Sequence, residues 1–183
     1  MANLVYIATS LDGYIATKEG GIEWLTNIPN PSGSDFGYAD FIARVDAILM
    51  GRNTFEKVLS FGGWHYEKPV FVLSKSLTEL PQRLEGKAEL ISGSPDKIQA
   101  TLSRRGLENI YIDGGMVVQS FLQADLIDEL IITTIPKLLG DGIPLFGKLE
   151  RMKAFTHLST EVINDCLVKS RYLRKKDASH ETG

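Results

Sequence analysis

The chain has few of the residues that stabilise secreted proteins or bind structural metals. Its 183 residues include one cysteine, Cys166, so no disulfide can form within it and a reducing compartment is compatible. Its three histidines are scattered, and no Cys or His pair has zinc-ligand spacing. The opening apolar run, Asn3 to Ala8, lacks a basic flank and is too short for a signal peptide or a membrane span. We therefore expect a cytoplasmic protein with no metal and no membrane partner, in which Cys166 is a packing residue.

Excess positive charge is also missing. The net charge is -3, and no basic stripe interleaved with aromatic residues occurs. The one concentrated basic run, Arg171 to Lys176, lies beside a polar end. We expect no nucleic acid partner. The length and the 43% hydrophobic content predict one domain over residues 1–174, followed by a polar tail at 175–183.

Apolar runs rich in β-branched and aromatic residues alternate with helical patterns along most of the chain. Most of these runs are apolar on both faces, which is typical of a largely parallel sheet covered by helices on each side. Two long extended stretches then predict an antiparallel hairpin at the C-terminal end. The expected strands are Leu4 to Ala8, Ala47 to Met50, Val70 to Leu73, Glu89 to Ile91, Ile110 to Ile112 and Leu130 to Ile135, with hairpin strands Ala154 to Val162 and Leu167 to Leu173. The expected helices are Phe36 to Val45, Thr54 to Ser60, Ser94 to Arg105 and Met116 to Ala124.

Two of the expected strands run straight into glycine and then into a helix. One passes through Met50, Gly51 and Arg52, and the other through Asp113, Gly114 and Gly115. At such a junction the unpaired N–H groups of the first helical turn and the positive end of the helix dipole can hold a phosphate. Each turn alone could simply need glycine for a positive φ. The pair, with Arg52 beside one member, points to a dinucleotide.

These elements and motifs, in this order, resemble the dihydrofolate reductase-like superfamily, and more closely its branch related to the reductase of riboflavin biosynthesis, the RibD C-terminal domain. The resemblance covers Leu4 to about Arg174 and implies an α/β/α fold with a mostly parallel central sheet and a C-terminal antiparallel hairpin. It rests on Ser10 to Ala16, Met50 to Glu56, Val72 to Lys75, Asp113 to Gly115 with Ser120 to Leu122, Leu126 to Leu130, and Pro136 to Gly142.

The resemblance implies NADPH as the cofactor, with its pyrophosphate across the two glycine turns. The residue chemistry agrees, because Arg52, Lys75 and the Ser74 hydroxyl suit an adenosine 2′-phosphate. A Gly-x-Gly-x-x-Gly run is absent, which argues against a Rossmann domain. The family also implies a cis peptide at Gly114-Gly115 or, as second choice, at Asp113-Gly114. The cofactor-binding residues so implied are Gly51, Arg52, Asn53, Thr54, Ser74, Lys75, Asp113, Gly114, Gly115, Met116 and Val117.

Three residues are candidates for the substrate end of the site. Asp35 falls where dihydrofolate reductases carry the carboxylate that holds the pteridine, although Ser34-Asp35 also suits a helix N-cap. Trp24 resembles the tryptophan of the loop that closes over the nicotinamide, with a core anchor as the alternative. Asp12 matches the riboflavin-type segment, and Asp12-Gly13 is also a tight-turn dipeptide. Weaker candidates for the proton path are Tyr6, Glu23 and Asp141.

Departures from the family leave the substrate open. Lys68 stands about where folate enzymes carry an arginine, and residues 26–33 lengthen the loop before Asp35. The deaminase domain that usually precedes the riboflavin reductase is absent from these 183 residues. The sequence predicts an NADPH-dependent reductase, similar to dihydrofolate reductase or to 5-amino-6-(5-phosphoribosylamino)uracil reductase, acting on a pterin-like, aminopyrimidine-like or sugar-like small molecule. A non-catalytic nucleotide-binding protein and an authentic dihydrofolate reductase are the alternatives. We expect a homodimer through the hairpin, Leu138, Leu139 and Ile143 to Phe146.

Overall fold

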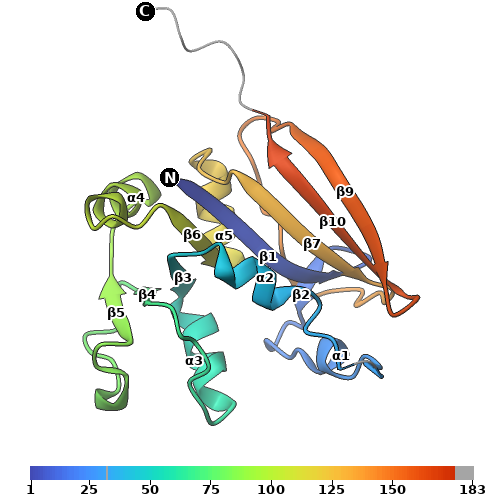
Figure 1. The fold of residues 1–183 in the computed structure, drawn as a ribbon, viewed down its shortest axis with the longest axis horizontal. Coiled ribbons are helices and arrows are strands. Elements are labelled where there is room, and N and C mark those ends of the chain that lie inside the picture. The colour runs from blue at the N-terminus through green and yellow to red at the C-terminus, as the bar shows by residue number, and fades with distance from the viewer. Residues whose placement is uncertain (32, 176–183) are drawn as a thin grey trace, which may run out of the picture.

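An eight-stranded sheet runs through the molecule in the order β5-β4-β3-β6-β1-β7-β10-β9 (Figure 1). The computed structural model describes residues 1–31 and 33–175, so the expected tail lies outside the described residues except for Lys175. The first six strands in this order are parallel, whereas β10 and β9 are antiparallel at one edge. The strands of the sheet are β1 (Ala2–Ser10), β3 (Ala47–Gly51), β4 (Val70–Leu73), β5 (Ala88–Ile91), β6 (Asn109–Asp113), β7 (Glu129–Ile135), β9 (Phe155–Ile163) and β10 (Leu167–Arg174).

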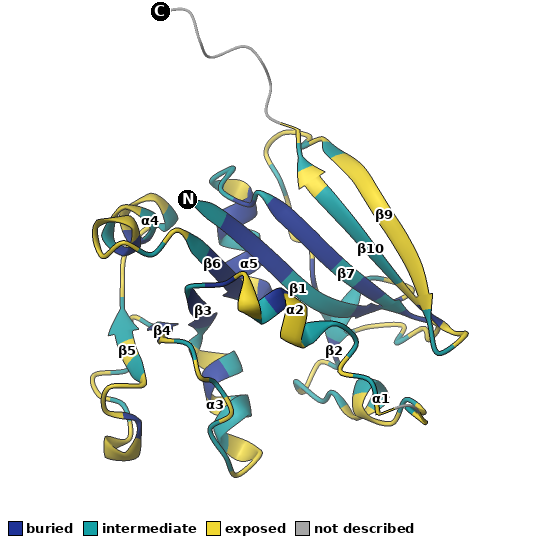
Figure 2. Ribbon diagram, in the orientation of Figure 1, coloured by how far each residue is buried: buried dark blue, intermediate teal, exposed yellow. Residues whose placement is uncertain are grey.

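Helices cover both faces of the sheet and divide the interior into two apolar layers (Figure 2). Successive side chains of β3 point to opposite faces of the sheet and so contribute to both layers. Ala47 and Leu49 belong to the layer under α4 and α5, and Ile48 and Met50 belong to the layer under α2 and α3. The sheet is thus apolar on both sides, as expected for buried parallel strands. The helices are α1 (Glu23–Thr26), α2 (Tyr38–Ala43), α3 (Arg52–Ser60), α4 (Pro95–Arg104) and α5 (Gly115–Gln123), with a 3₁₀ turn, η1 (Gln82–Leu84).

The expected α/β fold and terminal hairpin are confirmed, and the structure differs from the sequence expectations in several local details. Helix α2 is shorter than predicted, because Phe36 (φ 61°) and Gly37 (φ 87°) lie in the left-handed region and delay its start to Tyr38. The short helix α1 and the two-stranded pair β2 (Tyr14–Ala16) and β8 (Ile143–Pro144) were not predicted. Cys166 is exposed at the hairpin turn and does not pack in the core. Leu145, expected at a subunit interface, is fully buried.

Membrane-spanning helices and clusters of metal ligands are both missing from the part of the chain that the structure describes. No helix of residues 1–31 and 33–175 is long and apolar enough to cross a membrane. In the same part of the chain, no three His, Cys, Asp or Glu side chains are grouped so that they could hold a metal ion.

Candidate active site

The two glycine turns lie side by side at the carboxyl edge of the parallel strands. β3 and β6 are hydrogen-bonded neighbours, and Met50 pairs with Asp113 in their register. Gly51 and Gly114, the next residue on each strand, therefore leave the sheet at the same level. Helices α3 and α5 begin immediately after them, at Arg52 and Gly115.

Each glycine is required for a different physical reason. Gly51 has an ordinary extended conformation (φ −79°), but a Cβ there would lie 3.2 Å from Cγ2 of Val117 on α5. Gly114 has φ +87°, and a Cβ on it would collide with Oγ1 of Thr54 on α3. The first turn of each helix thus packs closely against the glycine of the other turn.

The expected cis peptide is not found: residues 1–31 and 33–175 contain no cis bond. The positive φ of Gly114 already turns the chain from β6 into α5, so the turn needs no cis bond.

The start of each helix leaves backbone donors for a ligand. Within the described residues neither α3 nor α5 has a side-chain cap at its N-terminus. The first intrahelical donor of α5 is the N–H of Val118, which donates to Gly114 O, so the N–H groups of Gly115, Met116 and Val117 are free of helical bonds. Met116 at this start is 75% exposed. Two adjacent, uncapped helix N-termini are of the kind that can bind an anion, and the cofactor-binding role of this edge stays a prediction.

Arg52 lies on the outer side of this edge, where strand β4 ends. Its Nη1 donates to Ser76 Oγ at 2.9 Å, and its Nε is 3.0 Å from Oε1 of Glu56 one turn along α3. The Ser74 hydroxyl accepts the N–H groups of Ser76 and Leu77 and so shapes the loop beneath Arg52. Lys75 is exposed in the same loop. Ser76 was not predicted, because only the turn after β4 brings its hydroxyl to Arg52.

Asp113 is the ionisable group at the centre of the edge. Burial raises the pKa of its carboxyl to about 6, against the opposing effect of hydrogen bonds from the Gly114 N–H and from Tyr111. The Asp113 charge contributes to the raised pKa of Tyr38, Tyr66 and Tyr111, although burial is the larger cause for each tyrosine. A carboxyl group with this pKa is part protonated near neutral pH and can donate a proton.

An aromatic group that packs against Phe55 of α3 was missed in the sequence. The Trp64 indole packs edge-on against Tyr66 at 5.3 Å and Phe55 at 6.1 Å between ring centroids. Its buried Nε1 has no hydrogen-bond partner among the described residues. A buried N–H without an acceptor is unfavourable, and this donor is closed to solvent in the packed interior. The one available signal was the density of aromatic residues between Phe61 and Tyr66.

Two of the three expected substrate residues hold backbone. The Asp12 carboxylate accepts the Ser10 hydroxyl and the N–H groups of Leu139 and Gly140, which lowers its pKa and ties down the loop after β7. The Asp35 carboxylate accepts the N–H groups of Ala39 and Gly37, which lowers its pKa and caps α2. No hydrogen bond or ion pair within residues 1–31 and 33–175 joins either carboxylate to Asp113. Their roles with substrate stay predictions.

The third expected residue, Trp24, lies on α1. Its buried Nε1 also lacks a partner among the described residues, and its carbonyl oxygen accepts Lys137 Nζ at 2.9 Å. Among the weaker candidates, Tyr6 donates to Phe36 O, and burial with the Asp35 charge raises its pKa to about 12, which makes it a poor acid. Asp141 is paired with Lys18, which lowers the pKa of the carboxyl.

Comparisons with known proteins agree with this fold. Residues 4–168 match the family model of the RibD C-terminal domain, and the chain belongs to that family. A candidate riboflavin biosynthesis protein from Shewanella sp. PV-4 has a similar solved structure, with a TM-score of 0.93 and 51% identity over 96% of this chain and 100% of that chain. The uncharacterised protein YwjB of Bacillus subtilis is 39% identical over 150 residues, which are 80% of this chain and 83% of that protein.

Two more distant structures share the fold alone. One is a diaminohydroxyphosphoribosylaminopyrimidine deaminase/5-amino-6-(5-phosphoribosylamino)uracil reductase from Thermotoga maritima, with a TM-score of 0.73 and 18% identity over 95% of this chain and 56% of that chain. The other is dihydrofolate reductase from Enterococcus faecalis, complexed with NADP(H) and RAB-propyl, with a TM-score of 0.68 and 17% identity over 96% of this chain and 97% of that chain. The fold is therefore dihydrofolate reductase-like.

Proposed function

We propose that this chain is an NADPH-dependent reductase that transfers a hydride to a small heterocyclic substrate of the pterin or aminopyrimidine kind, or to a sugar-like one. The observation that carries the proposal is the pair of glycine turns on adjacent strands. Two uncapped helix N-termini and one guanidinium group converge there. Membership in the RibD C-terminal domain family supports a reductase, and the single cysteine supports a cytoplasmic one.

The residues at the edge fit the proposed cofactor. The N–H groups that begin α3 (Arg52, Asn53 and Thr54) and α5 (Gly115, Met116 and Val117) would bind the pyrophosphate. A Cβ at position 51 or 114 would press against Val117 or Thr54 and so disturb the starts of these helices. Arg52, with Ser74, Lys75 and Ser76, would bind a 2′-phosphate, as guanidinium groups bind phosphate strongly. When bound, NADPH supplies the hydride. The NADP(H) complex of the Enterococcus faecalis neighbour supports this choice.

Reduction of a C=N or C=O bond also requires a proton, and we assign its delivery to Asp113. This carboxyl has a pKa of about 6 and lies at the end of β6, between the two glycine turns. Its protonated form donates at pH values where an ordinary aspartate is fully ionised.

Calorimetric titration with NADPH and NADH tests the cofactor assignment directly. We expect NADPH to bind at least about tenfold more tightly than NADH, because a charge-assisted phosphate contact contributes more than 1.4 kcal/mol. Absence of binding by either cofactor at millimolar concentration would contradict the proposal.

Oxidation of NADPH in the presence of dihydrofolate, dihydropterins and aminopyrimidine ribosides then tests turnover. Dihydrofolate turnover alone would identify an authentic dihydrofolate reductase. Cofactor binding without oxidation by any of these compounds would favour a non-catalytic nucleotide-binding protein.

A further inference from the structure

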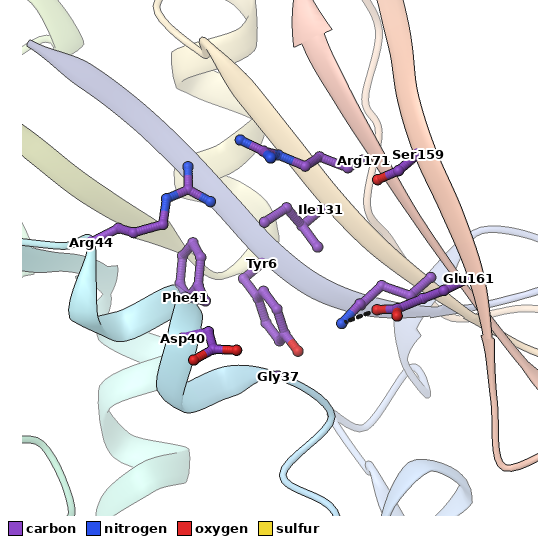
Figure 3. Close-up of a pocket in the computed structure, with 10 residues that line it drawn as sticks. Tyr6, Gly37, Asp40, Phe41, Arg44, Ile131, Ser159, Glu161 and Arg171 are labelled. Carbon is purple, nitrogen blue, oxygen red and sulfur yellow. Dashed lines mark ion pairs between the residues drawn. The ribbon is translucent and has the colours of Figure 1, made fainter.

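A cavity lies away from the glycine turns, between helix α2 and the antiparallel edge of the sheet. Its volume is about 280 Å³, and its walls come from β1, α2, β7, β9 and β10. Figure 3 shows Phe41, Tyr6 and Ile131 along its floor, with the guanidinium groups of Arg44 and Arg171 above Phe41. This volume suits one ring with a short polar substituent, at the small end of ligand pockets.

The two arginines at this cavity share one buried carboxylate. Glu129 at the start of β7 has a side chain only 5% exposed, and both guanidinium groups bind it. Arg44 donates through Nη1 and Nη2, and Arg171 through Nε and Nη2, so each carboxylate oxygen accepts two N–H groups. These arginines hold the pKa of Glu129 below its ordinary value despite burial, so the carboxylate stays charged.

One arginine is enough to neutralise one carboxylate, so the second leaves a surplus positive charge at the cavity wall. The Arg44 and Arg171 side chains remain 41% and 40% exposed. Nε of Arg44 and Nη1 of Arg171 have no acceptor among the described residues. A planar guanidinium group with free N–H donors binds carboxylate and phosphate oxygens.

The opposite end of the cavity limits what can bind. There Lys169 is paired with Glu161 and also donates to Phe36 O, so this cation is already used. The carboxylate of Asp40, one helical turn before Arg44, has no ion pair within the described residues, and Figure 3 shows it below Phe41. A second negative charge on the ligand would be repelled there. The cavity is therefore cationic at one end, apolar in the middle and acidic at the other.

We propose that this cavity, here called the Arg44–Arg171 pocket, binds a small organic anion. Its carboxylate or phosphate group contacts the two guanidinium groups, and its uncharged or cationic body lies on Phe41 and Ile131. The pocket is separate from the glycine turns, and the proposal does not depend on the reductase activity. A chain of contacts links the pocket to the candidate active site. Tyr6 stacks on Phe41 with ring centroids 4.7 Å apart, and its carbonyl oxygen accepts the Tyr111 hydroxyl. Tyr111 also contacts Asp113.

Titration with phenyl phosphate and benzoate tests the pocket, with benzylamine as the cationic probe of the same shape. The variant Ser159→Glu introduces a carboxylate opposite Arg171 without removing either arginine, because Ser159 lines the pocket and pairs with Arg171 across the strands. The matched control is Thr160→Glu, which adds the same charge on the opposite face of β9, where Thr160 Oγ1 contacts Ser170.

Both anionic probes should bind the wild type saturably and benzylamine should not. Their affinity should fall at least about tenfold in Ser159→Glu and stay unchanged in Thr160→Glu. Binding should also persist in Arg52→Gln, which removes the other candidate phosphate site, and should not be displaced by NADPH. If phenyl phosphate and benzoate do not bind at millimolar concentration, bind Ser159→Glu as tightly as wild type, or lose binding in Arg52→Gln alone, the proposal is wrong.

Discussion

At the scale of single residues, the chemistry of the candidate active site depends on two side chains in unusual surroundings. Asp113 is an acid whose pKa of about 6 comes from burial among tyrosines. Arg52 is a surface arginine that shares its donors between Ser76 and Glu56. In the proposed mechanism Asp113 would deliver the proton, and Arg52 would determine which cofactor is preferred.

The substitution Asp113→Asn tests the acid in two ways. Turnover of any substrate found should fall about 100-fold or more, and the decline in kcat as the pH rises through about 6 should disappear. The control is Asp96→Asn, an exposed position at the start of α4. Unchanged turnover with an unchanged pH profile would remove Asp113 from the mechanism.

The same substitution should change stability with a defined sign. The folded protein holds the Asp113 proton more tightly than the unfolded chain, so the charged carboxylate destabilises the fold above pH 6 and this penalty vanishes below pH 4. Asp113→Asn should therefore raise the free energy of unfolding by about 1–2 kcal/mol at pH 8, a value reduced for the partial exposure of the side chain, and leave it unchanged at pH 4. Urea unfolding at both pH values measures this, and a loss of stability at pH 8 would contradict it.

Arg52→Gln tests the cofactor preference. NADPH should bind about 10- to 100-fold more weakly, because a charge-assisted phosphate contact is lost, while NADH binding stays within about threefold. The matched control is Glu56→Gln on the next turn of α3, which frees Nε of Arg52 and should bind NADPH as tightly as the wild type or more so. Equal weakening of both cofactors in Arg52→Gln would mean that Arg52 does not contact a 2′-phosphate.

At the scale of elements, the two strand–glycine–helix units are fitted to each other. The sequence predicted both units and their phosphate-binding character, because glycine and apolar periodicity are local signals. The sequence left open whether Gly51 needs a positive φ. The structure gives another reason for a glycine at this position, because a Cβ would lie 3.2 Å from Cγ2 of Val117. That contact joins residues 66 positions apart, so only the pairing of β3 with β6 reveals it.

Gly114→Ala tests this fit. The alanine would adopt φ +87° at a cost of about 1 kcal/mol and would also collide with Thr54. We expect a total loss of about 2–4 kcal/mol in the free energy of unfolding, measured with denaturant. The control, Gly86→Ala, has φ +74° with no atom within 4 Å of a Cβ and so reports the backbone cost alone. Equal losses of unfolding free energy at both positions would show that the collision with Thr54 is relieved at no cost. Partial recovery of stability when Thr54→Ala is added to Gly114→Ala would support the collision.

At the scale of the whole molecule, the antiparallel edge is the part that remains uncovered. Strand β9 has one neighbour, and the cross-strand pair Val162 and Val168 is 65% and 39% exposed. Leu138 and Phe146, two residues of the predicted subunit interface, are also exposed and so are accessible to a partner subunit. Leu145 belongs to the core and is not accessible. Exposed apolar side chains on a long edge strand are typical of an association surface, and we retain the prediction of a homodimer.

Light scattering checks that prediction. The wild type should have twice the 20.3 kDa chain mass, and Val162→Lys combined with Val168→Lys should give a monomer that is still folded. Thr156→Lys, an exposed change on the same strand, serves as the control. A monomeric wild type at micromolar concentration would contradict the prediction.

Local patterns along the chain were sufficient to predict the sheet strands, the four longer helices, the terminal hairpin and the two glycine turns, because each leaves a signal within a few neighbouring residues. The family resemblance also grouped Arg52 with Ser74 and Lys75 as cofactor-binding residues, although Arg52 is distant from the other two along the chain. The contacts of the folded chain establish that Asp12 and Asp35 hold backbone, that Asp113 is half-buried with a raised pKa, and that Arg44 and Arg171 meet on Glu129 beside a cavity. Hydrogen-bond partners, burial and pKa depend on contacts between distant segments, and a linear sequence does not state which segments will meet.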